Sequence, residues 1–151
     1  MLTSSLPASL AIDSDSRHIK RAVHELMRGQ VQAVEAISGQ LVPRRRRSVL
    51  SNRRSMDRWH VKIPVQLWAA EWHGKQLCMA TDEPVLGLVR DLSYRGLGLA
   101  YDARLDSDLM IAEFDLFGEG PLQLLTELRW VRKRGEHDYL GGGLFQGLIR
   151  G

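Results

Sequence analysis

Cysteine is almost absent from this sequence: Cys78 is the only one among 151 residues. A single cysteine excludes an internal disulfide and any metal site built from several cysteines, and it is typical of a reducing compartment. No apolar run approaches the roughly 18 residues of a membrane-spanning helix. The first residues, MLTSSLPASLAIDSDSR, lack the charged start and long apolar stretch of a signal peptide. We therefore expect a cytoplasmic protein that does not insert into a membrane.

Motifs for catalysis are also lacking. The five histidines show no spacing typical of a metal site: His18, His24, His60, His73 and His137. Serine, histidine and aspartate residues occur, but never in a recognisable nucleophile motif. The sequence therefore predicts a protein that is not an enzyme.

Positive charge is unevenly distributed along the chain. The formal net charge is +3, yet residues 41–60 hold seven arginines and one aspartate. Residues 1–40 are balanced, and residues 61–151 hold ten Lys or Arg against thirteen Asp or Glu. A general nucleic-acid binder more often spreads its basic residues over a domain face. A concentrated basic patch beside an acidic domain suits a small, highly charged anion at least as well as it suits a nucleic acid.

The first third of the chain contains one expected helix. Residues 1–15 are rich in Ser, Ala, Leu and Asp, and we expect them to be disordered. Residues 16–38 carry a narrow seam at spacings of three and four, which is typical of helices that pair. The seam consists of Ile19, Val23, Leu26, Gln30, Ala33 and Ile37. Two interpretations are open: the helix docks on its own domain, or it pairs with a second copy or a partner protein.

Residues 39–58 are expected to form a basic linker. Pro43 prevents the helix from continuing, and the four consecutive arginines Arg44–Arg47 repel one another. This run is either a solvated stretch of charge or a reinforcement of a nearby anion site. We expect the segment to be a flexible arm in front of the domain that follows.

From Trp59 onward the apolar period becomes that of β-strands. The apolar residues at 61, 63, 65 and 67 alternate with Lys62, Pro64, Gln66 and Trp68, which predicts a half-buried strand. Because Pro64 cannot donate a ladder hydrogen bond, it marks an edge position or a bulge. Further short strand patterns follow, separated by turns and without a long helical pattern between them. Six or seven strands at this spacing predict an all-β barrel over residues 59–151.

Three arginines stand at the entrance of the first long strand: Arg53, Arg54 and Arg58. Guanidinium groups four residues apart in an extended or turning chain can curl around one ligand. The planar fork of arginine donates two parallel hydrogen bonds to phosphate. It also fits the O6/N7 edge of guanine and stacks on a base. The entrance is therefore a candidate anion site.

A second cluster, DLSYRG, occupies a strand–turn–strand junction and contains Asp91, Ser93 and Gly96. A carboxylate can accept from two N–H donors at once, such as N1 and N2 of guanine, and a hydroxyl can donate to a phosphate oxygen. Gly96 allows a flat ligand to approach the backbone, or adopts a φ value that other residues avoid. The alternative is a structural Asx-type turn with a glycine bulge.

Taken in order, RSMDR at 54–58 and DLSYRG at 91–96 resemble the RxxxR and DxSxxG motifs of the PilZ domain family. ELRWVRK followed by YLGGGLF also resembles the last long strands of that family. The resemblance covers about residues 50–150. It implies a six-stranded antiparallel β-barrel that binds the bacterial second messenger cyclic di-GMP, here with an N-terminal helical extension.

The resemblance also implies residue roles. Arg54 and Arg58 would clamp the ligand from the arm, while three residues would receive it on the barrel: Asp91, Ser93 and Gly96. Arg53 would add a phosphate or stacking contact. Trp130 matches a position where some members place an aromatic near a base, and its alternative role is packing in the core or at the rim.

Ligand number follows from the residue before RxxxR. A bulky apolar group there would cover the exposed guanine face, whereas Arg53 adds charge and a planar stacking surface. Two stacked ligands bring four phosphate charges together, and a dense arginine cluster can offset their repulsion. We therefore expect two cyclic di-GMP molecules per chain.

The sequence thus predicts a cyclic di-GMP receptor whose arm and helix change position on binding and so regulate a partner. Motility, biofilm attachment and exopolysaccharide output are all compatible with the family. One alternative is a small β-barrel that binds single-stranded nucleic acid through the arginine run and Trp59 or Trp130. Another is a PilZ-like assembly module without ligand.

Overall fold

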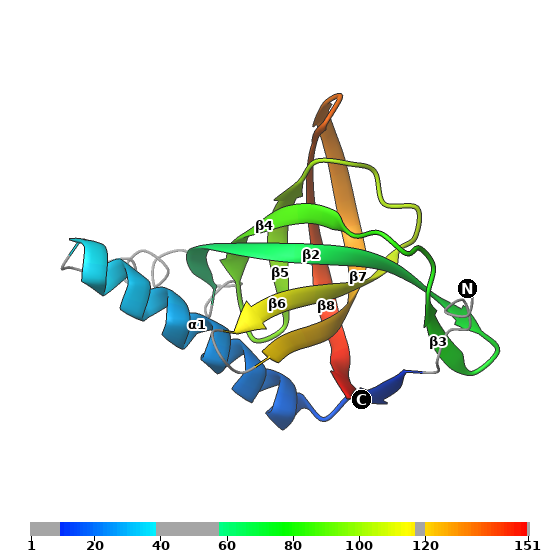
Figure 1. Ribbon diagram of the computed structural model, residues 1–151, viewed down its shortest axis with the longest axis horizontal. Coiled ribbons are helices and arrows are strands. Elements are labelled where there is room, and N and C mark those ends of the chain that lie inside the picture. The colour runs from blue at the N-terminus through cyan, green and yellow to red at the C-terminus, as the bar shows by residue number, and fades with distance from the viewer. Residues whose placement is uncertain (1–9, 39–57, 117–119, 151) are drawn as a thin grey trace.

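The computed structural model describes residues 10–38, 58–116 and 120–150, with side chains described for 10–28, 58–115 and 120–150. In these ranges one helix accompanies eight strands (Figure 1). In chain order they are β1 (Ala11–Asp13), α1 (Ser16–Ser38), β2 (Trp59–His73), β3 (Gln76–Met79), β4 (Val85–Leu92), β5 (Gly96–Tyr101), β6 (Leu109–Leu116), β7 (Gly120–Gly135) and β8 (Asp138–Arg150). The all-β class expected from the sequence is confirmed.

Six of these strands pair in a closed cycle. β8 pairs with β5, β5 with β4, β4 with β2, β2 with β6, β6 with β7, and β7 again with β8. All of these pairings are antiparallel, and β1 and β3 lie outside the cycle, on β8 and β2 respectively. The expectation of six strands is therefore wrong for the described ranges, which contain eight.

The additional strand β3 arises because β2 is longer than its partner β4. The pairing of β2 with β4 ends at Leu67 of β2, but β2 continues to His73. The chain then turns back through Gly74, whose φ is +67°. Such a φ strains residues with a Cβ, so glycine suits the turn. The returning segment pairs with the overhanging end of β2.

The core fills the inner side of the cycle. Five of its fully buried side chains come from β2, β4, β6 and β7: Leu67, Val89, Leu92, Met110 and Leu124. Full burial of one such side chain contributes roughly 1.5–3 kcal/mol. In β2 the apolar residues at 61, 65 and 67 are buried and Ile63 is partly buried, whereas the residues at 62, 64 and 66 are exposed, in agreement with the predicted alternation.

Helix α1 packs its first half on this core. Ile19, Val23 and Leu26 of the predicted seam are at most 7% exposed and belong to the core cluster. In this half the seam therefore packs within the chain, which is the first of the two interpretations left open by the sequence. The seam residues Gln30, Ala33 and Ile37 have side chains outside the described residues. Figure 1 shows the far end of α1 running past the edge of the sheet.

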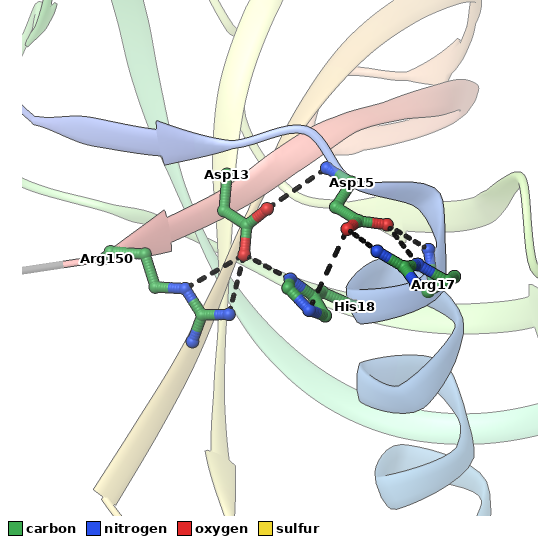
Figure 2. A network of polar contacts seen from close by, with 5 residues as sticks. All are labelled: Asp13, Asp15, Arg17, His18 and Arg150. Atoms are coloured by element: carbon green, nitrogen blue, oxygen red, sulfur yellow. Dashed lines mark hydrogen bonds and ion pairs between the residues drawn. The ribbon is translucent and has the colours of Figure 1, made fainter.

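The expected disorder of residues 1–15 is wrong for its last part, since residues 11–13 form β1 on the last residues of β8. Asp13 accepts hydrogen bonds from Arg150, from His18 Nδ1 at 2.7 Å and from the backbone N–H of Asp15 at 3.0 Å (Figure 2). These contacts, with Arg150 first, lower the pKa of Asp13 to about 2. They join the start of α1 to the end of β8. Residues 1–9 lie outside the described ranges.

Within the described ranges, no helix combines the length and apolarity needed to cross a membrane.

Candidate site on the outer face of the sheet

Arg58 and Asp91 form an ion pair between the start of β2 and the end of β4. The two residues are 33 positions apart, and the antiparallel register sets His60 opposite Asp91 and Trp59 opposite Leu92. The side chains of Arg58 and Asp91 are 47% and 25% exposed, so solvent and solutes reach both. The structure thus brings one residue of RxxxR into direct contact with one residue of DxSxxG.

Other predicted arginines cannot be placed. Arg53, Arg54 and the run Arg44–Arg47 lie outside the described residues, as does the rest of the basic linker. Their roles stay predictions.

Ser93 makes a tight local turn. Its Oγ accepts hydrogen bonds from the backbone N–H of Arg95 at 3.2 Å and of Gly96 at 3.1 Å. The hydroxyl in turn lies 3.3 Å from the carbonyl oxygen of Gly96, which also accepts from the Ser93 N–H at 2.9 Å. The turn is therefore made by the serine hydroxyl rather than by the Asx-type contact that the sequence offered as an alternative, and Asp91 pairs with Arg58 instead. A phosphate contact by Ser93 requires its hydroxyl to rotate away from Gly96.

Gly96 is glycine because β8 lies against it. A Cβ at this position would overlap the carbonyl oxygen of Gly143 and lie 3.1 Å from its carbonyl carbon. Its φ is not positive, since Gly74 and Gly120 alone have positive φ in the described ranges. The suggestion of an unusual φ at Gly96 is therefore wrong, and the close approach is made by the protein's own backbone.

A row of paired residues connects Asp91 with Trp130. Asp91 in β4 is opposite Gly98 in β5, Gly98 is opposite Gly142 in β8, and Gly142 is opposite Trp130 in β7. Directly paired residues of antiparallel strands point to the same face of a sheet. The residues on either side of Gly98, Leu97 and Leu99, face the core, so the row lies on the outer face.

The two glycines allow the flanking side chains to lean toward each other. A Cβ on Gly98 would lie 2.6 Å from a carboxylate oxygen of Asp91. A Cβ on Gly142 would overlap Nε1 of Trp130 and lie 2.7 Å from Cε2 of the same ring. The carboxylate and the indole therefore lie over neighbouring glycines, although their backbones are three strand spacings of about 4.8 Å apart.

Register shifts precede both flanking residues. The β4–β5 pairing shifts between Val89 and Asp91, and the β7–β8 pairing shifts between Leu128 and Trp130. Bulges re-aim side chains and are common beside functional sites. Here the β7 shift leaves Trp130 on the outer face, 53% exposed, rather than in the core.

We call the set Arg58, Asp91, Gly98, Gly142 and Trp130 the outer row. Sequence reasoning found the two charged residues and the tryptophan but missed both glycines as part of the site. The signal available was the small residue at every second position of GLGL and within GGG, which indicates close approach from above a strand. Within the described residues, no group of three or more His, Cys, Asp or Glu could hold a metal ion.

The outer row offers three kinds of chemical contact. An exposed guanidinium supplies hydrogen-bond donors and positive charge, a carboxylate supplies acceptors, and an exposed indole supplies a flat apolar face. A planar, anionic ligand with N–H donors on one edge would find a partner for each of its features here.

Comparison with models of known protein families gave no match to this chain, and comparison with curated proteins gave none either.

Proposed function

We propose that this protein is a non-enzymatic receptor for cyclic di-GMP, with the outer row as part of its binding site. One observation carries the proposal: Arg58 and Asp91 meet across two strands, on the same row as an exposed Trp130 that leans over paired glycines. The three side chains come from distant parts of the sequence and supply the three kinds of contact that a guanine nucleotide needs.

The ion pair gives the ligand two contacts at once. Asp91 can exchange its Arg58 partner for the N1–H and N2–H donors of guanine. Arg58 is then released to a phosphate, where a charge-assisted hydrogen bond contributes about 1.5–3 kcal/mol. Both residues are partly exposed, so this exchange requires no rearrangement of the core.

Trp130 supplies a stacking surface in this proposal. Stacking of a base on an aromatic side chain contributes about 1–3 kcal/mol. At 53% exposure the indole has a free area for a base, and its Nε1 lies above Gly142 on the side of Asp91. Gly98 and Gly142 are buried beneath these two side chains, so a base would stack on the exposed face of the indole, on the same row as the carboxylate.

The fold is consistent with a PilZ-like β-barrel. The closed cycle of strand pairings supports a barrel, to which β1 and β3 are attached. Residues Arg53 and Arg54 complete the proposed arginine clamp, with two stacked ligands per chain. The proposal places this receptor in the bacterial cytoplasm, where ligand binding would act on a partner protein.

Binding of single-stranded nucleic acid is a second candidate, because exposed Trp130 is flanked in β7 by Arg129 and Arg132. Exposed aromatics among cations are the usual platform for such strands. The two candidates differ in the use of Asp91, because its carboxylate selects guanine among the bases, whereas a platform for single strands stacks every base alike.

The test is filter binding with labelled cyclic di-GMP and labelled single-stranded RNA at one salt concentration. Arg58→Ala is expected to lose most cyclic di-GMP binding. Arg104→Ala is the matched control, because Arg104 is 78% exposed and lies near Asp106 in the β5–β6 connection. Binding of RNA but not of the dinucleotide by the wild-type chain would replace the proposal by the second candidate.

A further inference from the structure

Tyr94 links the DxSxxG turn to helix α1. It lies between Ser93 and Arg95, and its hydroxyl shares a hydrogen bond of 2.8 Å with Nε2 of His24 in α1. The two rings are 5.2 Å apart and tilted. From the same helix, Lys20 Nζ lies 4.8 Å from the centroid of the Tyr94 ring.

Tyr94 also touches the strand that carries Arg58. The ring of Trp59 packs edge-on against Tyr94 with centroids 5.2 Å apart. Trp59 directly follows Arg58 and is paired with Leu92 in β4. One side chain, partly buried against the core, therefore contacts α1, the start of β2 and the turn that holds Ser93.

We infer that His24, Lys20 and Tyr94 are positioning residues for the cyclic di-GMP site, and that docking of α1 and ligand binding therefore stabilise each other. The inference rests on the proposed function. None of the three needs to touch the ligand: α1 holds Tyr94, and Tyr94 holds Trp59 and the turn.

The physical basis is pre-organisation. A ligand that binds an ordered turn and an ordered Arg58 has less conformational entropy to remove than one that binds a mobile loop. Docking of α1 orders both segments through one ring. Because coupling between two binding events is reciprocal, bound ligand must in turn stabilise the docked helix.

The experiment uses the full chain with Tyr94→Phe, which removes only the hydroxyl, and His24→Ala, which removes its partner. Tyr139→Phe and His73→Ala are matched controls: Tyr139 stacks on Tyr101, and His73 pairs with Glu71 at the β2–β3 turn. Melting temperatures verify that each variant folds.

The first readout is hydrogen exchange without ligand at the Arg95 and Gly96 amides, which donate to Ser93 Oγ. We expect several-fold faster exchange in the two α1-contact variants and wild-type exchange in the controls. The second readout is the dissociation constant for cyclic di-GMP, which we expect to rise about three- to tenfold on loss of one hydrogen bond. In the wild-type protein, bound ligand should slow exchange at Val23 and Leu26.

The possible results distinguish failure of the positioning role from failure of the proposed receptor function. Wild-type affinity and wild-type turn exchange in both variants would overturn the positioning role while leaving the receptor function intact. Weakened binding with unchanged hydrogen exchange at the Arg95 and Gly96 amides would overturn the claim that Tyr94 acts by ordering the Ser93 turn. Absence of cyclic di-GMP binding by the wild-type chain would overturn the receptor function, whatever the exchange data show.

Discussion

Replacing Gly142 by alanine is expected to weaken cyclic di-GMP binding while leaving the fold intact. A Cβ at this position would overlap Nε1 of Trp130, so the indole must swing away from the glycine row. The Trp130 side chain is 53% exposed and can move into solvent without disturbing the core. Alanine itself fits an extended strand, and its backbone effect on stability is small and favourable.

The magnitude follows from the lost stacking surface. A base on an aromatic side chain contributes about 1–3 kcal/mol, which corresponds to about fivefold to about 150-fold in the dissociation constant. We expect the lower part of this range, because a displaced indole on a flexible side chain still visits the ligand. Trp130→Ala removes the surface altogether and should reach the upper part.

Titration calorimetry on four proteins measures this effect: wild type, Gly142→Ala, Trp130→Ala and the double variant. Gly135→Ala is the control, because a Cβ there meets nothing closer than the Cβ of Asp138 at 3.6 Å. If the Gly142→Ala substitution acts through the indole, the double variant binds no more weakly than Trp130→Ala. Additive losses, or wild-type affinity for Gly142→Ala, would refute the reasoning.

Four further predictions concern charged residues. Arg58→Ala and Arg54→Ala should each weaken cyclic di-GMP binding by about 1.5–3 kcal/mol with unchanged circular dichroism; wild-type affinity at the same salt would count against the arginine clamp. Asp91→Ala should reduce the preference for cyclic di-GMP over cyclic di-AMP, because adenine lacks the N1–H and N2 donors. Equal affinity of the wild type for both dinucleotides would exclude this role. Arg53→Leu should lower the calorimetric stoichiometry from two ligands per chain to one, and saturation of the wild type at one would disprove the stacked pair. The pKa of Asp13 falls from 3.8 to about 2 on folding, so its stabilisation is present above about pH 4 and disappears as the pH falls toward 2. Denaturation midpoints of wild type and Asp13→Asn should therefore differ at pH 7 and converge near pH 2, and a constant difference would contradict the assignment.

Much of the fold could be predicted from periodicity. Alternation over residues 61–67 and the turn residues at 74 and 81–84 indicated the succession of strands along the chain, because the inner face of each strand must be apolar. β1 could not be predicted, since three residues show no period and its partner Arg150 lies 139 positions away from Ala11. Nor could the surface against which the α1 seam packs be predicted, because an apolar stripe packs equally well on a sheet or on another helix.

The candidate site was partly predictable from a sequence motif rather than from apolar periodicity. Arg58 and Asp91 are recognisable because their chemistry and spacing form a motif. The glycines of GLGL and GGG indicate close approach over a strand, but the pairing of Gly98 with Asp91 and of Gly142 with Trp130 depends on cross-strand register, which a single sequence does not specify. The same holds for Tyr94, whose partner His24 is 70 positions away and carries no motif.

The most direct test of the central claim is a nitrogen–proton NMR titration with cyclic di-GMP, observing the tryptophan indole N–H signals and the glycine amides. The account predicts that the Trp130 indole and the amides of Gly98 and Gly142 shift with increasing ligand. The Trp68 indole, held by Glu113 at 2.9 Å, should stay in place as an internal control. Shifts at Trp68 without shifts at Trp130, or a spectrum that ligand leaves unchanged, would contradict a binding site on the outer row.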